Sequence, residues 1–190
     1  MSERRISLGL PLLIDYLYWV RDRVLRAADG LDRDEFGATP TVQNRDLRGT
    51  LTHELDIEMG WRARLRGDAA EVWEAELDPG QFHTLEALAE AWRADELEMR
   101  HWLDALTQAD LEAPVTVNRL EGYPMAVYLL HVIEHGVMEL TDAAAILASM
   151  GRSTGDLGVL DALDDLAPVA RGSAPTRDPA DPTGPAGPAG

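Results

Sequence analysis

Four long stretches of this sequence repeat apolar residues at intervals of three and four, and glycine or proline stands near the breaks between them. This interval places the apolar side chains on one side of an α-helix. The pattern predicts long helices over residues 7–29, 46–67, 84–106 and 124–151, followed by a short helix over 156–166. No segment carries a convincing strand pattern, so the sequence predicts an all-α bundle of four long helices.

The ends of these helices carry residues that commonly begin or end a helix. Asp46 is a suitable N-cap for the second helix, because its carboxylate can accept a hydrogen bond from a free backbone N–H. Gly30 follows the first helix, and Pro124 suits the first turn of the fourth. Residues 1–166 are therefore interpreted as one bundle domain. Residues 167–190, rich in proline, glycine and alanine, are interpreted as a disordered tail.

The formal net charge of −17 argues against several classes of partner. Nucleic acids and anionic membranes are bound mainly through Lys and Arg, which acidic residues outnumber here. The chain has no cysteine, so disulfides, thiolate metal ligands and a cysteine nucleophile are excluded. It also lacks a secretory signal pattern and any apolar run approaching the roughly 20 residues of a membrane span. We therefore expect a cytoplasmic protein that acts on a small molecule.

The predicted fourth helix contains ionisable residues within a largely apolar sequence. His131, Glu134, His135 and Glu139 stand among aliphatic residues, where an unpaired charge is costly to bury. His131, His135 and Glu139 are four residues apart and lie along one side of a helix. Two of them could bind one metal ion with a third ligand from another helix, and His53 on the second helix is the candidate. A buried His–Glu hydrogen-bond network that holds the helices in register is the alternative.

Other polar residues have ordinary interpretations. His83 at a loop–helix junction and His101 on the charged side of the third helix are expected to be solvated. Asp95 or Glu96 interrupts the apolar side of the third helix, where such a residue either lines a cavity or turns to solvent. The sequence has no phosphate-binding glycine loop and no nucleophile elbow, so the buried histidines and acids are the candidates for chemistry.

Several segments resemble, in order and spacing, the DinB/YfiT-like family of four-helix bundles. The resemblance is carried by Tyr16–Leu25 and Gly30–Phe36, by Asp46–His53 in the second helix, by Leu130–His135 in the fourth, and by Gly151–Leu157 after it. It spans roughly residues 8–165. It implies an up-down-down-up four-helix bundle with one mononuclear metal site.

The family's usual metal ligands are one histidine on the second helix and two on the fourth, four residues apart. His53 and His135 match the first two positions, whereas Glu139 stands at the third. Leu140–Asp142 stands where the family commonly has Arg-Gly-Gln. Two histidines and one glutamate form an established catalytic ligand set that leaves a position for water or substrate. The carboxylate lowers the net charge of the site by one, so the metal is expected to acidify a bound water or thiol less strongly.

The resemblance implies a metal-dependent enzyme, since characterised relatives include thiol S-transferases and a mycothiol-dependent isomerase. We expect zinc, nickel, iron or manganese to be held by His53, His135 and Glu139. A low-molecular-weight thiol such as mycothiol is the expected cosubstrate, and water-dependent hydrolysis is the neighbouring option. Glu134 and Asp142 are the candidates for proton transfer.

Two alternatives accompany this prediction. His131 could replace Glu139 as the third ligand, although an alignment without a gap across Gly136 and Gly151 favours Glu139. The protein could instead be a non-catalytic metal-binding or ligand-binding helical protein with a degenerate site. Because dimers are common among relatives, a homodimer is expected in either case.

Overall fold

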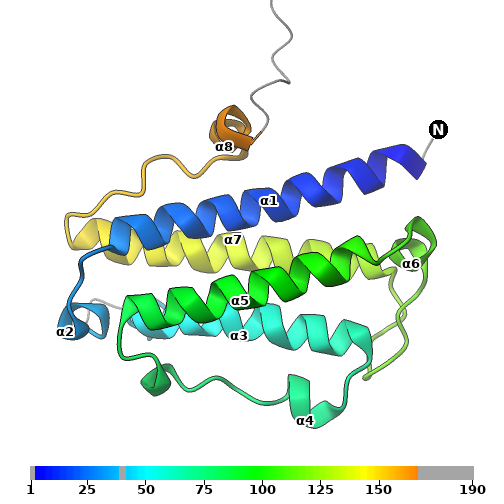
Figure 1. Cartoon of the computed structure of the whole chain (residues 1–190), viewed down its shortest axis with the longest axis horizontal. Coiled ribbons are helices and arrows are strands. Elements are labelled where there is room, and N and C mark those ends of the chain that lie inside the picture. Colours follow the sequence, from blue (N-terminus) through cyan, green and yellow to red (C-terminus); the bar gives the residue numbers. More distant parts are fainter. Residues whose placement is uncertain (1–2, 39–41, 167–190) are drawn as a thin grey trace, which may run out of the picture.

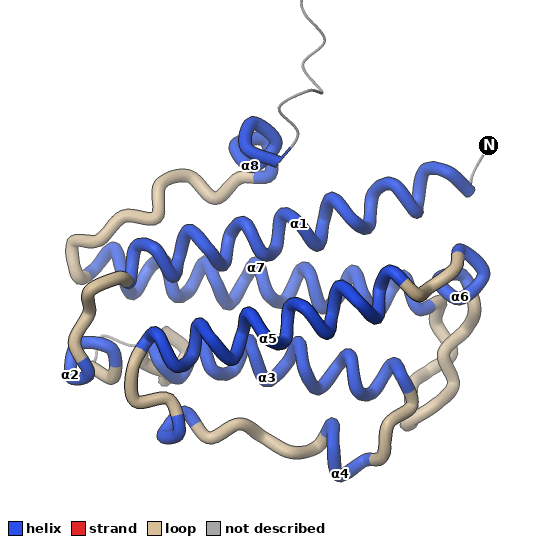
Figure 2. The backbone as a smooth tube through the Cα atoms, viewed as in Figure 1, coloured by secondary structure: helices blue, strands red, loops and turns tan. Residues whose placement is uncertain are grey.

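The computed structural model describes residues 3–38 and 42–166, and the regular structure within these ranges is helical (Figure 2). Four long helices form the bundle: α1 (Glu3–Ala28), α3 (Leu47–Arg66), α5 (Leu85–Asp104) and α7 (Met125–Ser149). Shorter segments connect or follow them: α2 (Arg33–Phe36), α4 (Ala70–Trp73), the 3-10 turn η1 (Pro79–Gln81), α6 (Gln108–Glu112) and α8 (Val159–Leu166). The predicted tail, 167–190, lies outside the described residues.

The long helices follow the up-down-down-up order that the resemblance implies (Figure 1). α1 and α7 run in one direction along the bundle, and α3 and α5 run in the other. Because α3 and α5 are parallel, the segment 67–84 between them returns along the length of the bundle and carries α4 and η1. α7 makes its most extensive contacts with α3 and α1. The all-α bundle predicted from the sequence is confirmed.

Most helix ends agree with the sequence pattern. Asp46 is the N-cap of α3, and its side chain accepts a hydrogen bond from the backbone N–H of Gly49 at 2.7 Å. Pro124 is the N-cap of α7 rather than its first helical residue. α1 begins at Glu3, earlier than predicted, and continues through Pro11. The short segments α2, α4, η1 and α6 were not predicted, because a single turn is too short to show a helical repeat.

Apolar side chains from all four long helices fill the main core. The most buried members include Leu17, Val20, Val24, Leu51, Leu55, Leu88, Trp92, Leu140 and Ile146. Full burial of one such side chain contributes roughly 1.5–3 kcal/mol, so this core is the main source of the bundle's stability. No helix in the described part of the chain has both the length and the apolar character needed to cross a membrane.

A buried polar cluster lies beside this core. Glu58 of α3 is fully buried. Its carboxyl group accepts a hydrogen bond from the indole N–H of Trp92 at 3.0 Å and another from the hydroxyl of Tyr18 at 3.1 Å. Arg62, one turn further along α3, forms an ion pair with the buried Asp95 of α5. Asp95, which the sequence left open between a cavity and solvent, therefore points into the bundle and neutralises Arg62.

Glu58 should make the protein less stable as the pH rises. Burial, together with nearby Glu54 and Asp95, raises the pKa of its carboxyl well above the ordinary 4.5, and the attraction of Arg21 only partly opposes this. Because the folded pKa exceeds the unfolded pKa, this contribution to stability is complete below the unfolded pKa and is lost as the pH rises through the folded pKa. We expect the melting temperature to fall as the pH rises above the ordinary carboxyl pKa of 4.5, and to fall less in Glu58→Gln, which cannot ionise.

Thermal unfolding followed by circular dichroism at several pH values measures this difference. Glu90→Gln, at an exposed position of α5, is the matched control, because it makes the same chemical change away from the buried cluster. Parallel pH profiles for the wild type and Glu58→Gln would show that Glu58 is not the group responsible.

Candidate metal centre

His53, His135 and Glu139 converge between α3 and α7. His53 lies on α3, and His135 and Glu139 lie one turn apart on α7. One ligand atom from each lies within 4.8 Å of the others. Nε2 of His53 is 4.0 Å from Oε1 of Glu139, and Nε2 of His135 is 3.9 Å from the same oxygen. Among the described residues, this is the one group of His, Asp and Glu side chains whose spacing could hold a metal ion.

The arrangement fits a divalent metal ion. Ligand atoms at roughly 2.0–2.1 Å from a tetrahedral metal lie about 3.3 Å apart, so modest side-chain rotations would complete the site. The side chain of Glu139 is 8% exposed, whereas those of His53 and His135 are 28% and 24% exposed. Burial, and then nearby Arg45, lowers the pKa of His53 below the ordinary 6.5, so its imidazole is neutral near pH 7. Neutral imidazole is the form that binds a metal.

Glu54 orients His135 from inside the bundle. Its Oε2 is hydrogen-bonded to Nδ1 of His135 at 2.9 Å, and its side chain is fully buried. Burial, with nearby Glu139, raises the pKa of the Glu54 carboxyl well above the ordinary 4.5. Because Nδ1 faces Glu54, Nε2 is the nitrogen that faces Glu139. Carboxylates that hold the second nitrogen of a ligating histidine fix the orientation of the ring and strengthen metal binding.

Gly136 provides the space that Glu54 occupies. A Cβ on Gly136 would lie 2.4 Å from Oε1 of Glu54 and 2.6 Å from Cδ1 of Leu17. Glycine inside a helix costs roughly 0.5–1 kcal/mol relative to alanine. Its presence in the middle of α7 is explained by this close approach of α1 and α3, directly beside His135.

Arg45 compensates the charge of Glu139. Its guanidinium donates to Oε2 of Glu139 at 2.9 Å, so the other carboxylate oxygen, Oε1, is the one that faces the two imidazoles. The sequence predicts that Glu139 makes the site more negative by one charge than three histidines would. That prediction did not include Arg45. The ion pair with Arg45 therefore offsets part of the negative charge that Glu139 brings to the site.

A tight turn before α3 contacts two of the three acids of the predicted site, Glu139 and Asp142. Val42 and Arg45 exchange two backbone hydrogen bonds, of 3.1 and 3.0 Å, and Gln43 and Asn44 between them have positive φ values of 51° and 64°. These values are typical of a type I′ turn, which usually contains glycine. Gln43 donates to the Asp142 carboxylate at 2.7 Å, while Arg45 reaches Glu139. Unfavourable backbone conformations of this kind persist where the surrounding contacts enforce them, often at functional sites.

The other residues named from the sequence lie near this group but outside it. His131 is exposed, and its ring lies between those of Trp61 and His135, with centroid separations of 5.2 and 6.1 Å. Glu134 is exposed on α7. The geometry thus places Glu139, rather than His131, with the two predicted histidine ligands. Proton-transfer roles for Glu134 and Asp142 stay predictions.

A cavity of about 520 Å³ opens beside His53, one of the three candidate ligands. Its lining includes His53 and Arg45 of the centre, together with Arg48, Asp56 and residues of the segment that leads into η1. This volume falls within the range of small-molecule sites. A substrate in the cavity would therefore lie against His53.

Comparison with known protein families gives the fold and the site a context. The model of the DinB family matches residues 1–163, which is most of the chain. The chain belongs to the DinB family. No curated protein matches it significantly. The family match confirms the resemblance seen in the sequence, and the His53–His135–Glu139 group supports metal binding by this DinB protein.

Sequence reasoning missed two residues that contact the candidate ligands of this DinB protein, Glu54 and Arg45. The sequence did contain a signal for Glu54. Leu47 and Leu51 lie on the buried side of α3, and the same repeat of three and four residues continues to Glu54 and Glu58. Acids on the buried side of a helix require polar partners. His135 is the partner of Glu54. Arg45 carried no such signal, because it precedes the helix and meets Glu139 only in the folded chain.

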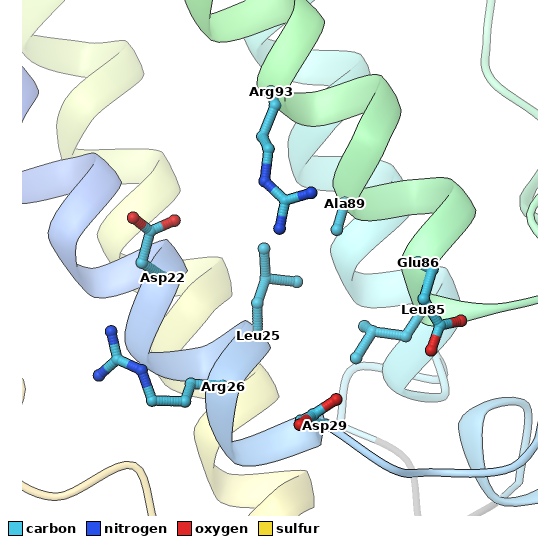
Figure 3. A pocket seen from close by; sticks show the side chains of 8 residues that line it. All are labelled: Asp22, Leu25, Arg26, Asp29, Leu85, Glu86, Ala89 and Arg93. Atoms are coloured by element: carbon cyan, nitrogen blue, oxygen red, sulfur yellow. The ribbon is translucent and has the colours of Figure 1, made fainter.

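A second cavity of this DinB protein, of about 410 Å³, lies between α1 and α5 (Figure 3). Charged side chains of both signs surround its apolar floor of Leu25, Leu85 and Ala89. Arg93 extends from α5 toward α1 in this gap. None of the lining residues belongs to the metal centre, and this cavity contains no histidine.

Proposed function

We propose that this DinB protein is a metal-dependent enzyme that activates a low-molecular-weight thiol, of the S-transferase type, or alternatively water. The observation that carries the proposal is the convergence of His53, His135 and Glu139 beside an open cavity. A bound divalent metal would supply Lewis acidity, which lowers the pKa of a thiol or water at neutral pH. The thiol must come from a cosubstrate, because this chain has no cysteine.

The protein's own residues divide the remaining work. His53 and His135 offer imidazole nitrogens, and Glu139 offers Oε1 while Arg45 holds Oε2. Glu54 keeps the His135 ring in the orientation that directs Nε2 to the site. The partial exposure of the two imidazoles allows a cosubstrate to approach from the solvent side.

Asp142 and Glu134 are proposed to transfer protons between the cosubstrate and solvent. Asp142 lies one turn beyond Glu139, and the contact with Gln43 restrains its carboxylate. Glu134 is exposed next to His135 in the sequence and can exchange protons with bulk water. Mycothiol and a zinc, nickel, iron or manganese ion are the proposed cosubstrate and metal.

A second candidate function is non-catalytic binding of a metal or small ligand, with a homodimeric assembly. The ion pair between Arg45 and Glu139 favours this candidate, because the carboxylate already has a partner at 2.9 Å and gains less from a metal than an unpaired ligand would. Both candidate functions can include a bound metal, so metal content does not distinguish them. The reaction of a thiol at the site does.

We expect cobalt-loaded protein to bind 2-mercaptoethanol with a thiolate-to-cobalt absorption band, and zinc-loaded protein to conjugate a thiol to a chloro-dinitrobenzene electrophile. Wild-type protein treated with a chelator is the control in both assays. Hydrolysis of an ester or amide without any thiol reaction would support activation of water. Metal binding with neither reaction would support the non-catalytic candidate.

A further inference from the structure

Arg48 is an unusual arginine in an acidic protein. Its side chain is partly buried at the wall of the 520 Å³ cavity, and its Nε is buried without a hydrogen-bond partner. In the described part of the chain, the other arginines shielded from solvent each contact a carboxylate or carbonyl oxygen: Arg21, Arg23, Arg45, Arg62, Arg64, Arg100 and Arg152. Although the chain has 34 acidic residues, Arg48 pairs with none of those that the structure describes, so its guanidinium is available for a ligand.

The fold makes room for this guanidinium. A Cβ on Gly37 would lie 3.1 Å from Nη2 of Arg48 and 3.2 Å from its Cζ, so the guanidinium lies against the backbone at the end of α2. Glycine at this position allows that approach. The side chain is thus held at the cavity wall by packing and not by an ion pair.

The acids that line the same cavity do not neutralise Arg48. Asp46 accepts a hydrogen bond from the backbone of Gly49, and Asp56 accepts one from Leu77 at 2.9 Å. Glu76 is exposed at the rim. These carboxylates oppose a doubly charged ligand more strongly than a singly charged one. The cavity is therefore better suited to a carboxylate than to a phosphate dianion.

We propose that Arg48 binds a carboxylate group of the substrate, in the cavity that borders the metal ligand His53. The proposal rests on the proposed function, because it assigns the substrate-recognition residue of the same site. A guanidinium presents paired N–H groups that match the two oxygens of a carboxylate. The substrate class is then a small molecule that carries a carboxylate and places its reactive group against His53.

Carboxylate binding can be measured on the chelator-treated, metal-free protein, so its outcome does not depend on the metal. We expect butyrate to shift the NMR signals of residues around the cavity, whereas neutral butyramide, of matched shape, does not. Arg48→Met should weaken butyrate binding at least tenfold, with Arg48→Lys intermediate. Arg93→Met, which removes an exposed arginine at the cavity between α1 and α5, is the control and should bind like the wild type.

Equal shifts with butyrate and butyramide, or undiminished butyrate binding in Arg48→Met, would overturn the proposal. The comparison of butyrate with butyramide uses wild-type protein, so it tests the proposal even if a variant folds poorly. Inorganic phosphate should bind more weakly than butyrate, and tighter phosphate binding would also count against a carboxylate site. Loss of metal binding with intact butyrate binding would refute the proposed function and leave this inference standing.

Discussion

His135→Ala should purify with almost no bound metal, whereas the wild-type protein should carry close to one divalent ion per chain. The substitution removes a ligand nitrogen and also leaves the buried Glu54 without its imidazole partner. Loss of a residue that only supports a ligand typically lowers metal affinity 10–100-fold, so loss of the ligand itself should exceed on the order of 100-fold. His53→Ala should have a similar effect, because it removes the α3 side of the site.

Elemental analysis of protein prepared without a histidine tag, followed by chelator competition, measures this effect. His101→Ala is the matched control, because it removes an exposed histidine of α5 that lies outside the ligand group. His131→Ala tests the alternative third ligand and should retain metal. Undiminished metal content in both His53→Ala and His135→Ala would end the case for this centre.

Gly136→Ala should destabilise the bundle by about 1–3 kcal/mol, the usual cost of an added methyl group in a packed interior. The new Cβ would overlap Oε1 of Glu54 and Cδ1 of Leu17, and both neighbours are buried. Glu54 would have to move, and its contact with His135 would weaken. The substitution should therefore lower metal affinity as well as stability, although it alters no ligand.

Gly9→Ala is the matched control for this prediction. Gly9 also lies inside a long helix, α1, but a Cβ there would meet no atom within 4 Å. The same change should then stabilise the protein by roughly 0.5–1 kcal/mol, through the helix preference of alanine alone. Chemical denaturation measures both variants. A Gly136→Ala protein as stable as Gly9→Ala would mean that α1 and α3 are not held against α7 as described.

Much of the fold could be predicted from the sequence, because each long helix carries its own repeat and its own end signals. Asp46 is an example, since its capping bond to Gly49 involves residues three apart. The ligand group was predictable for a related reason. His135 and Glu139 share one side of α7 through the helical repeat, and the family resemblance supplied His53 from another helix.

The surroundings of the ligands could not be predicted, because they depend on contacts between distant segments. Arg45 and Glu139 are 94 residues apart, and Glu54 and His135 are 81 apart. The helical repeat of Leu47 and Leu51 marks Glu54 as a buried position, but it does not show which side chain Glu54 meets. The turn at Gln43 was not predicted either, since Asn44 is only a weak signal for such a turn and Gln43 rarely adopts a positive φ.

The central position of α7 also has a consequence for biosynthesis. The helix that contacts α1 and α3 most extensively is the last of the long helices to be translated. Until it emerges from the ribosome, the apolar sides of the earlier helices lack their main partner, and such exposed surfaces promote aggregation. We therefore expect the core to close, and the candidate metal centre to form, only after α7 with Glu139 has been added.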